Sequence, residues 1–72
     1  MSNANMLYTA MMEGRWRPTL EVDQLENGSY RAHYMDGNGK TIEFTDDSQS
    51  HALNTLSSLV RDAARNGEIA PR

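Results

Sequence analysis

The sequence predicts an α+β fold in which a three-stranded antiparallel sheet packs on one C-terminal helix. Apolar residues recur at three- and four-residue steps over residues 46–67, which is the period of a helix with one buried face. Before that segment, three stretches alternate apolar and polar side chains, and two glycine-containing turns separate them. Because an isolated helix of this length is marginal in water, its apolar face needs the sheet.

The C-terminal segment carries start and stop signals at both of its ends. Asp46, Asp47 and Ser48 can accept hydrogen bonds from the free N–H groups of a first helical turn. Gly67 suits a left-handed stop, and Ile69 can then fold back onto the apolar face. The predicted apolar stripe consists of Leu53, Leu56, Leu59, Val60, Ala63 and Ala64.

The three alternating stretches predict strands over residues 15–25, 29–35 and 40–45. Pro18 has no N–H to donate to a ladder, so the first strand lies at a sheet edge or begins after this residue. The side chains that share the parity of the tyrosines form the predicted inner face, which is Leu20, Val22, Tyr30, Ala32, Tyr34, Ile42 and Phe44.

The strand register follows from the requirement that these apolar side chains share one face. A two-residue loop at Asn27-Gly28 would pair Val22 with His33 and place Val22 opposite the tyrosine face. An extra residue in this hairpin restores the common face. We therefore predict a bulged first hairpin, and a three-residue second loop in which Gly39 has a positive φ.

The N-terminal part is less determined. Residues 1–5 are small and polar and are predicted to form a disordered tail, while residues 6–70 form a single domain. Residues 6–13 fit a short helix or a fourth strand equally well, because a short apolar run has no decisive period. Gly14 ends either element.

Composition limits the classes of function. The formal net charge is −3, which argues against nucleic acid as a direct partner. No cysteine is present, so disulfides, thiol nucleophiles and thiolate metal sites are excluded. No apolar run approaches the roughly 20 residues of a membrane span, and no signal-peptide pattern is visible. We expect a cytoplasmic protein, a monomer or weak dimer, with no membrane partner.

Catalytic and metal-binding patterns are missing from the sequence. The two histidines, His33 and His51, have no carboxylate or thiol at a metal-ligand spacing. No nucleophile stands beside a base, and the glycine-rich segment 37–39 connects two strands without preceding a helix. We therefore expect no enzymatic activity, no metal and no cofactor.

A partner-binding surface is the remaining possibility. Tryptophan and arginine dominate protein interfaces, and methionine adapts to irregular ones. The segment around Trp16 combines these residue types, although the same residues would also serve to close one end of the core. The open sheet face offers a second patch. The predicted partner-binding residues are Met11, Met12, Arg15, Trp16, Arg17, Arg31 and His33.

The opening Met1-Ser2-Asn3-Ala4-Asn5 resembles the start of a family of small phage-encoded regulators of host RNA polymerase. The short length and acidic character of the chain are similar to that family as well. The resemblance implies a non-enzymatic protein in the host cytoplasm that binds a large subunit of bacterial RNA polymerase. It further implies inhibition of transcription initiation or an effect on termination, such as antitermination.

Two alternatives stay open. If residues 6–13 form a helix, the element order becomes that of double-stranded-RNA-binding domains, although Asp46 and Asp47 stand where those domains carry lysines. A decoy protein of a toxin–antitoxin or anti-defence system is the other alternative.

Overall fold

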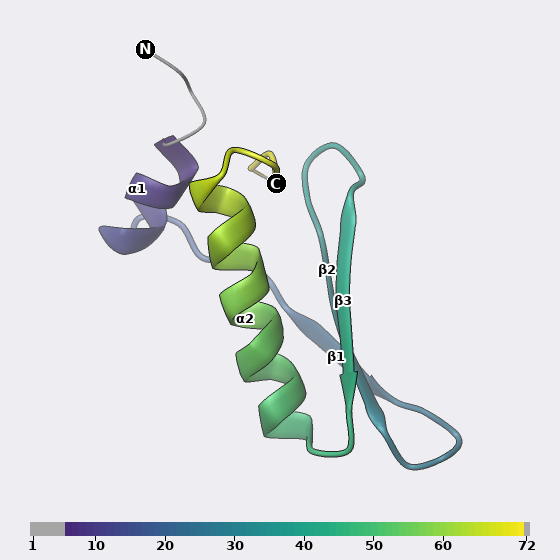
Figure 1. Cartoon of the computed structure of the whole chain (residues 1–72). Coiled ribbons are helices and arrows are strands. Elements are labelled where there is room, and N and C mark those ends of the chain that lie inside the picture. The colour runs from purple at the N-terminus through teal and green to yellow at the C-terminus, as the bar shows by residue number, and fades with distance from the viewer. Residues whose placement is uncertain (1–5, 72) are drawn as a thin grey trace.

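The computed structural model describes residues 6–71, so the predicted tail 1–5 lies outside the described residues. Helix α2 lies along one face of a three-stranded sheet, and α1 packs beside the C-terminal end of α2 (Figure 1). The predicted α+β class is confirmed, and the N-terminal element is the short helix. The elements in chain order are α1 (Met6–Met12), β1 (Glu21–Gln24), β2 (Tyr30–Met35), β3 (Thr41–Asp46) and α2 (Gln49–Arg65).

The sheet is an antiparallel meander with β2 in the centre. Ala32 pairs with Val22 on one side and with Phe44 on the other, so the three strands share the predicted inner face. Leu20, also predicted there, lies just before β1 and packs against the core. In the first hairpin the N–H of Leu25 donates to the carbonyl oxygen of Ser29 at 2.7 Å, which encloses three loop residues. The last of these, Gly28, has a φ of 89°. The predicted bulged hairpin is confirmed.

The second hairpin uses the same device. The N–H of Asp36 donates to the carbonyl oxygen of Lys40 at 2.8 Å, and Gly39 has a φ of 85°. Because only glycine adopts this region without a steric penalty, Gly39 is required by the loop. The prediction of a positive φ at Gly39 is confirmed.

The first strand is shorter than predicted. Only Glu21–Gln24 forms β1, and residues 15–20 form an extended connection between α1 and the sheet. The strand prediction over residues 15–20 was wrong, because Pro18 interrupts the ladder and the chain before it turns toward α1. The narrower expectation, that the strand lies at an edge or begins after Pro18, is confirmed, because β1 is an edge strand and begins at Glu21.

Helix α2 begins later than the predicted residue 46. Ser48 is the N-cap, and its hydroxyl accepts from the N–H of His51 at 3.3 Å. Asp46 ends β3, and its carboxylate accepts from the N–H of Ser48 at 2.9 Å and contacts the His51 ring at 3.1 Å. These two interactions, led by the backbone one, lower the pKa of Asp46.

The end of α2 is a Schellman motif. The N–H of Gly67 donates to the carbonyl oxygen of Ala64 at 3.1 Å, and the N–H of Glu68 to that of Ala63 at 2.9 Å. Gly67 has a φ of 71°, as a left-handed stop requires. Ile69 then returns to the core, where its side chain is buried, so the predicted fold-back is confirmed.

The core lies between α2 and the inner sheet face. Along α2 the buried side chains are mostly those of the predicted stripe. Two details differ: Ala52 is fully buried although it was not predicted, and Leu59 remains 39% exposed because it lies at the margin of the stripe. The buried apolar residues are Leu7, Ala32, Tyr34, Ala52, Leu56, Val60, Ala63, Ala64 and Ile69.

Asp36 is the only buried charged side chain among residues 6–71. One of its oxygens, Oδ1, accepts from the backbone N–H groups of Asn38 at 2.9 Å and Lys40 at 2.7 Å. The other, Oδ2, accepts from the N–H of Ala70 at 3.0 Å. The N–H of Gly37 donates to the carbonyl oxygen of Ala70, so the C-terminal segment is bound to the β2–β3 turn.

Candidate functional site

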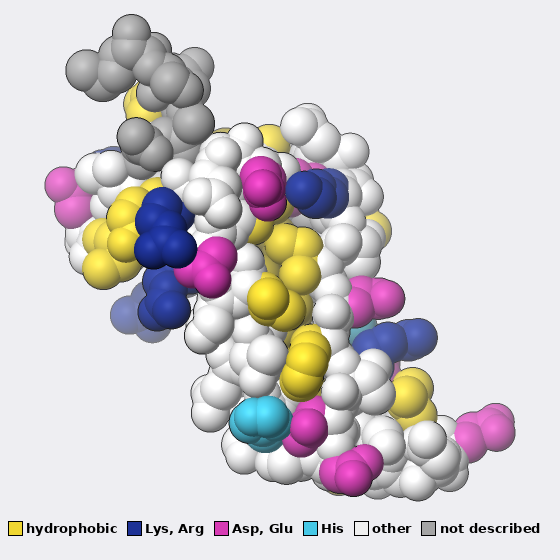
Figure 2. Space-filling model, in the orientation of Figure 1, with side chains coloured by type: hydrophobic (Ala, Val, Ile, Leu, Met, Phe, Trp, Pro, Cys, Tyr) yellow, Lys and Arg dark blue, Asp and Glu magenta, His cyan; other side chains and the backbone are white. Residues whose placement is uncertain are grey.

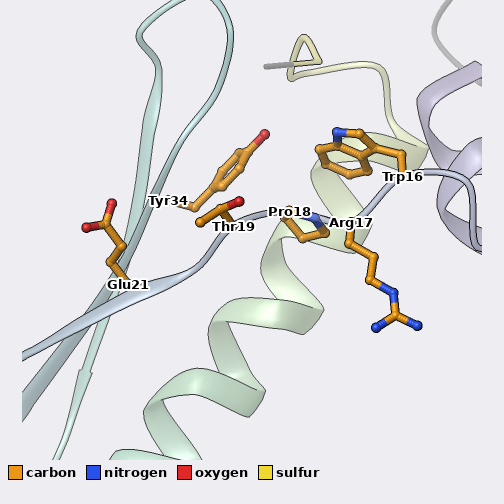
Figure 3. A pocket seen from close by; sticks show the side chains of 6 residues that line it. All are labelled: Trp16, Arg17, Pro18, Thr19, Glu21 and Tyr34. Atoms are coloured by element: carbon orange, nitrogen blue, oxygen red, sulfur yellow. The ribbon is translucent and has the colours of Figure 1, made fainter.

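A shallow pocket lies where the connection between α1 and β1 passes over the end of β2. Its volume is about 220 Å³. The rings of Trp16 and Tyr34 flank it, and the connection passes between them at its base, while Arg17 and Glu21 extend away in different directions (Figure 3). The lining residues are Trp16, Arg17, Pro18, Thr19, Glu21 and Tyr34.

The two aromatic rings give the pocket its shape. Their centroids are 6.5 Å apart and their planes meet at 81°, which is an edge-to-face contact. Tyr34 is 2% exposed and is part of the core, whereas Trp16 is only half-buried. The core therefore holds one wall of the pocket in place, and the other wall stays accessible to a partner.

The cationic residues of this region differ in their interactions. The guanidinium of Arg15 contacts the carboxylate of Glu13 at 2.6 Å, so its charge is partly neutralised. Arg17 forms no ion pair with a side chain of residues 6–71, and it lines the pocket. Arg17 is therefore the cation that is available at the rim.

The predicted methionines divide between core and surface. Met11 is half-buried and packs against the core, whereas the side chain of Met12 is 62% exposed at the end of α1. Met11 therefore helps to close one end of the core, and Met12 faces solvent at the end of α1, a few residues before Trp16. A role of the two methionines in partner binding stays a prediction.

The second predicted patch lies on the other face of the sheet. Arg31 and His33 have the opposite parity to Tyr34 on β2, so they project away from α2. His33 Nε2 lies 3.0 Å from Oδ2 of Asp23 on the neighbouring strand. The seven predicted residues therefore form two separate surfaces, and the pocket described above belongs to the one around Trp16.

Four of the lining residues were not predicted as site residues: Pro18, Thr19, Glu21 and Tyr34. Glu21 and Tyr34 were placed on opposite faces of the sheet, which is correct for the strands themselves. The connection passes over the end of β2 and so brings both residues to one pocket. No periodic pattern in the sequence predicts that path of the chain. The tryptophan was the one feature of the sequence that pointed to this pocket.

The chemistry available at the pocket is that of recognition. Its volume lies below the roughly 300 Å³ at which small-molecule sites begin, so it fits a single side chain better than a substrate or cofactor. Within residues 6–71, no cluster of three or more potential metal ligands occurs, and neither helix could cross a membrane.

The fold defines the class to which the protein belongs: a small α+β domain with a meander sheet and a helix on one face. Comparison of the chain with known protein families, curated proteins and solved structures finds no match.

Proposed function

We propose that the protein is a non-enzymatic binding module that receives an apolar side chain of a larger protein in the Trp16 pocket. The observation that supports this proposal is the combination, at one shallow pocket, of a core-supported aromatic wall, a half-exposed tryptophan and an arginine that has no ion pair among residues 6–71. Tryptophan, tyrosine and arginine are enriched among the residues that dominate the binding energy of protein interfaces. Met12, four residues before Trp16 in the sequence, adds exposed apolar surface.

The first partner to test is bacterial RNA polymerase, because of the sequence resemblance to small phage-encoded regulators. In this proposal the protein acts in the host cytoplasm, and its binding inhibits transcription initiation or changes termination. The partner supplies the protruding side chain, and Arg17 contacts an acidic or carbonyl oxygen beside it.

The test is a binding titration with purified RNA polymerase together with transcription assays of initiation and termination. Trp16→Ala is expected to weaken binding by more than about 2 kcal/mol, as for a central interface residue. Arg17→Glu serves as the second variant, in case Trp16→Ala reduces stability, because the exposed side chain of Arg17 is expected to tolerate substitution without loss of the fold. The control pair Arg31→Ala and His33→Ala alters the other sheet face and should bind as the wild type does.

The proposal fails for this partner if the wild type does not bind RNA polymerase. The pocket is excluded as a contact surface if Trp16→Ala and Arg17→Glu recover every host protein as well as the wild type does in an affinity experiment.

Duplex RNA is a second candidate ligand, because the element order α1-β1-β2-β3-α2 is the one expected for double-stranded-RNA-binding domains. The charge opposes this function. Asp46 and Asp47 precede α2, and the whole chain has a net charge of −3. A salt titration with duplex RNA decides between the two candidates: absence of binding at low salt eliminates the RNA function.

A further inference from the structure

Strand β3 has a free edge. The strand order β1-β2-β3 gives it one neighbour, and no other strand of residues 6–71 pairs with its outer side. The N–H of Asp36 donates to the carbonyl oxygen of Lys40, so these two residues form a hydrogen-bonded pair at the start of the β2–β3 ladder. Hydrogen-bonded pairs recur at every second residue of an antiparallel ladder, so the backbone groups of Ile42 and Phe44 bond to β2. The backbone N–H and C=O groups of the alternating residues point away from β2. These residues are Thr41, Glu43 and Thr45.

An apolar seam runs beside this edge. Ile42 and Phe44 face α2 but are only half-buried. The Phe44 ring meets the His51 ring at a centroid distance of 6.2 Å, which places that flank of α2 over β3. Leu59, 39% exposed, follows about two turns later on the same flank. Figure 2 shows hydrophobic side chains in a row along this face of the molecule.

The β3 edge lacks three of the features that normally block strand addition: short length, proline and a bulge. It is six residues long and contains no proline, and its pairing with β2 is continuous, without a bulge. Glu43 is the one charged side chain among its outward-bonding residues. The opposite edge differs, because β1 has only four residues and Pro18 stands shortly before it.

We propose that the β3 edge accepts an extended segment of a partner protein in which apolar residues alternate with basic ones. Main-chain hydrogen bonds to Thr41, Glu43 and Thr45 hold the added strand. Its apolar side chains cover the seam of Ile42, Phe44 and Leu59, and its basic side chains lie beside Glu43 on the open sheet face. This surface is separate from the Trp16 pocket.

Charge selects a basic segment over a second copy of this chain. A symmetric antiparallel pair of β3 strands centred on Glu43 would place the two Glu43 side chains directly opposite each other, which is unfavourable. A lysine or arginine at that position makes a favourable cross-strand pair instead. Asp46 and Asp47 at the end of the strand extend the acidic character of this edge.

The probe is a short peptide of alternating valine and lysine, followed by amide hydrogen exchange of the full chain by NMR. We expect the amides of Thr41, Glu43 and Thr45 to exchange at least about tenfold more slowly when the peptide is bound. A peptide with N-methyl groups on the bonding side should not protect them. Trp16→Ala should bind the peptide as the wild type does, so a failure here is distinct from a failure of the Trp16 pocket.

The matched variants place a proline on each edge. Glu43→Pro removes an outward N–H without breaking the β2–β3 ladder, and it should abolish protection. Gln24→Pro does the same on β1, where its N–H also points outward, and it should leave peptide binding unchanged. If Glu43→Pro unfolds, Glu43→Lys replaces it and should transfer the preference to a valine–glutamate peptide.

The proposal is overturned by several results. One is an absence of peptide binding, and another is protection of β1 amides instead of β3 amides. Equal binding of the N-methylated peptide also contradicts it. Sedimentation as a dimer with the β3 amides already protected would identify a second copy as the occupant, which contradicts the basic partner segment.

Discussion

Asp36 shows how a single side chain in a turn can hold two distant segments together. Its carboxylate accepts three backbone N–H groups, two from the turn and one from Ala70. The hydrogen bond from Ala70 contributes most to lowering the pKa of Asp36. The hydrogen bonds from Lys40 and Asn38 and the positive charge of Lys40 lower it further, whereas burial of the carboxylate raises it. The ionised form is therefore stabilised by folding.

The pH dependence of stability should follow from this carboxylate. Because the pKa of Asp36 in the folded protein lies below its ordinary value of 3.8, its contribution is present above that value and is lost as the pH falls through the folded pKa. We expect Asp36→Asn to lower the melting temperature at neutral pH and to make the decline in acid shallower. Thermal unfolding between pH 7 and pH 2 measures both effects.

Asp46 also has a lowered pKa, so part of the acid-induced decline should persist in Asp36→Asn. The exposed Asp23→Asn serves as the control and should change the neutral melting temperature less than Asp36→Asn does. An Asp36→Asn protein with the wild-type acid profile would show that the carboxylate contributes nothing to stability through its charge.

Substitution of Gly39 tests the contribution of the backbone conformation alone to stability. Its φ of 85° is unfavourable for other residues, and an added Cβ would meet nothing within 4 Å. We expect Gly39→Ala to cost about 1–2 kcal/mol of unfolding free energy, entirely through the left-handed backbone. Gly39→Asn should cost less, because asparagine tolerates this region better. Urea unfolding measures the difference, and equal costs for the two variants would refute the explanation.

At the scale of the element, α2 is stable only because the sheet covers one of its faces. Leu56 is fully buried against the sheet, whereas Leu59 is 39% exposed, although both belong to the same apolar pattern. The position of a leucine around the helix therefore decides its energetic role.

Leu56→Ala is expected to destabilise the protein by about 2–5 kcal/mol, because it leaves a cavity in the core. Leu59→Ala removes a side chain at the margin and should cost about 0.5 kcal/mol or less. Circular dichroism during urea unfolding compares the two variants. A cost for Leu59→Ala as large as that for Leu56→Ala would contradict the marginal position of Leu59.

At the scale of the whole molecule, the C-terminal segment closes the fold. Ile69 is buried, Ala70 is bonded to Asp36 and Gly37, and a Cβ at Gly37 would collide with the carbonyl oxygen of Pro71. The sheet and both helices thus share a core with residues that follow the last helix.

Removal of this segment should weaken the entire domain. A small domain buries only about 60% of its unfolded surface, so it has little stability in reserve. We expect Ile69→Ala to cost about 2–5 kcal/mol. Truncation after Gly67 should cost more, because the bonds of Ala70 to Asp36 and Gly37 are lost as well. Calorimetry ranks the two, with exposed Glu68→Ala as the control. A truncated chain as stable as Ile69→Ala would show that the bonds of Ala70 add nothing.

The amino-acid pattern is sufficient to predict the elements whose side chains repeat with a regular period. The helical spacing of Leu56, Val60 and Ala63 predicts α2, and the alternation around Ala32 and Phe44 predicts β2, β3 and their shared face. The bulged first hairpin and the three-residue second loop followed as well, because a slip of one residue would expose an entire apolar face.

The features that depend on non-repeating connections become visible only in the folded chain. The path of the chain before β1 forms the Trp16 pocket, and the return of the C-terminal segment buries Asp36. Each of these contacts joins residues that are distant in sequence and occurs only once, so no periodic sequence pattern predicts it. Periodic burial is a local property of the chain, whereas such single contacts exist only after the whole molecule has packed.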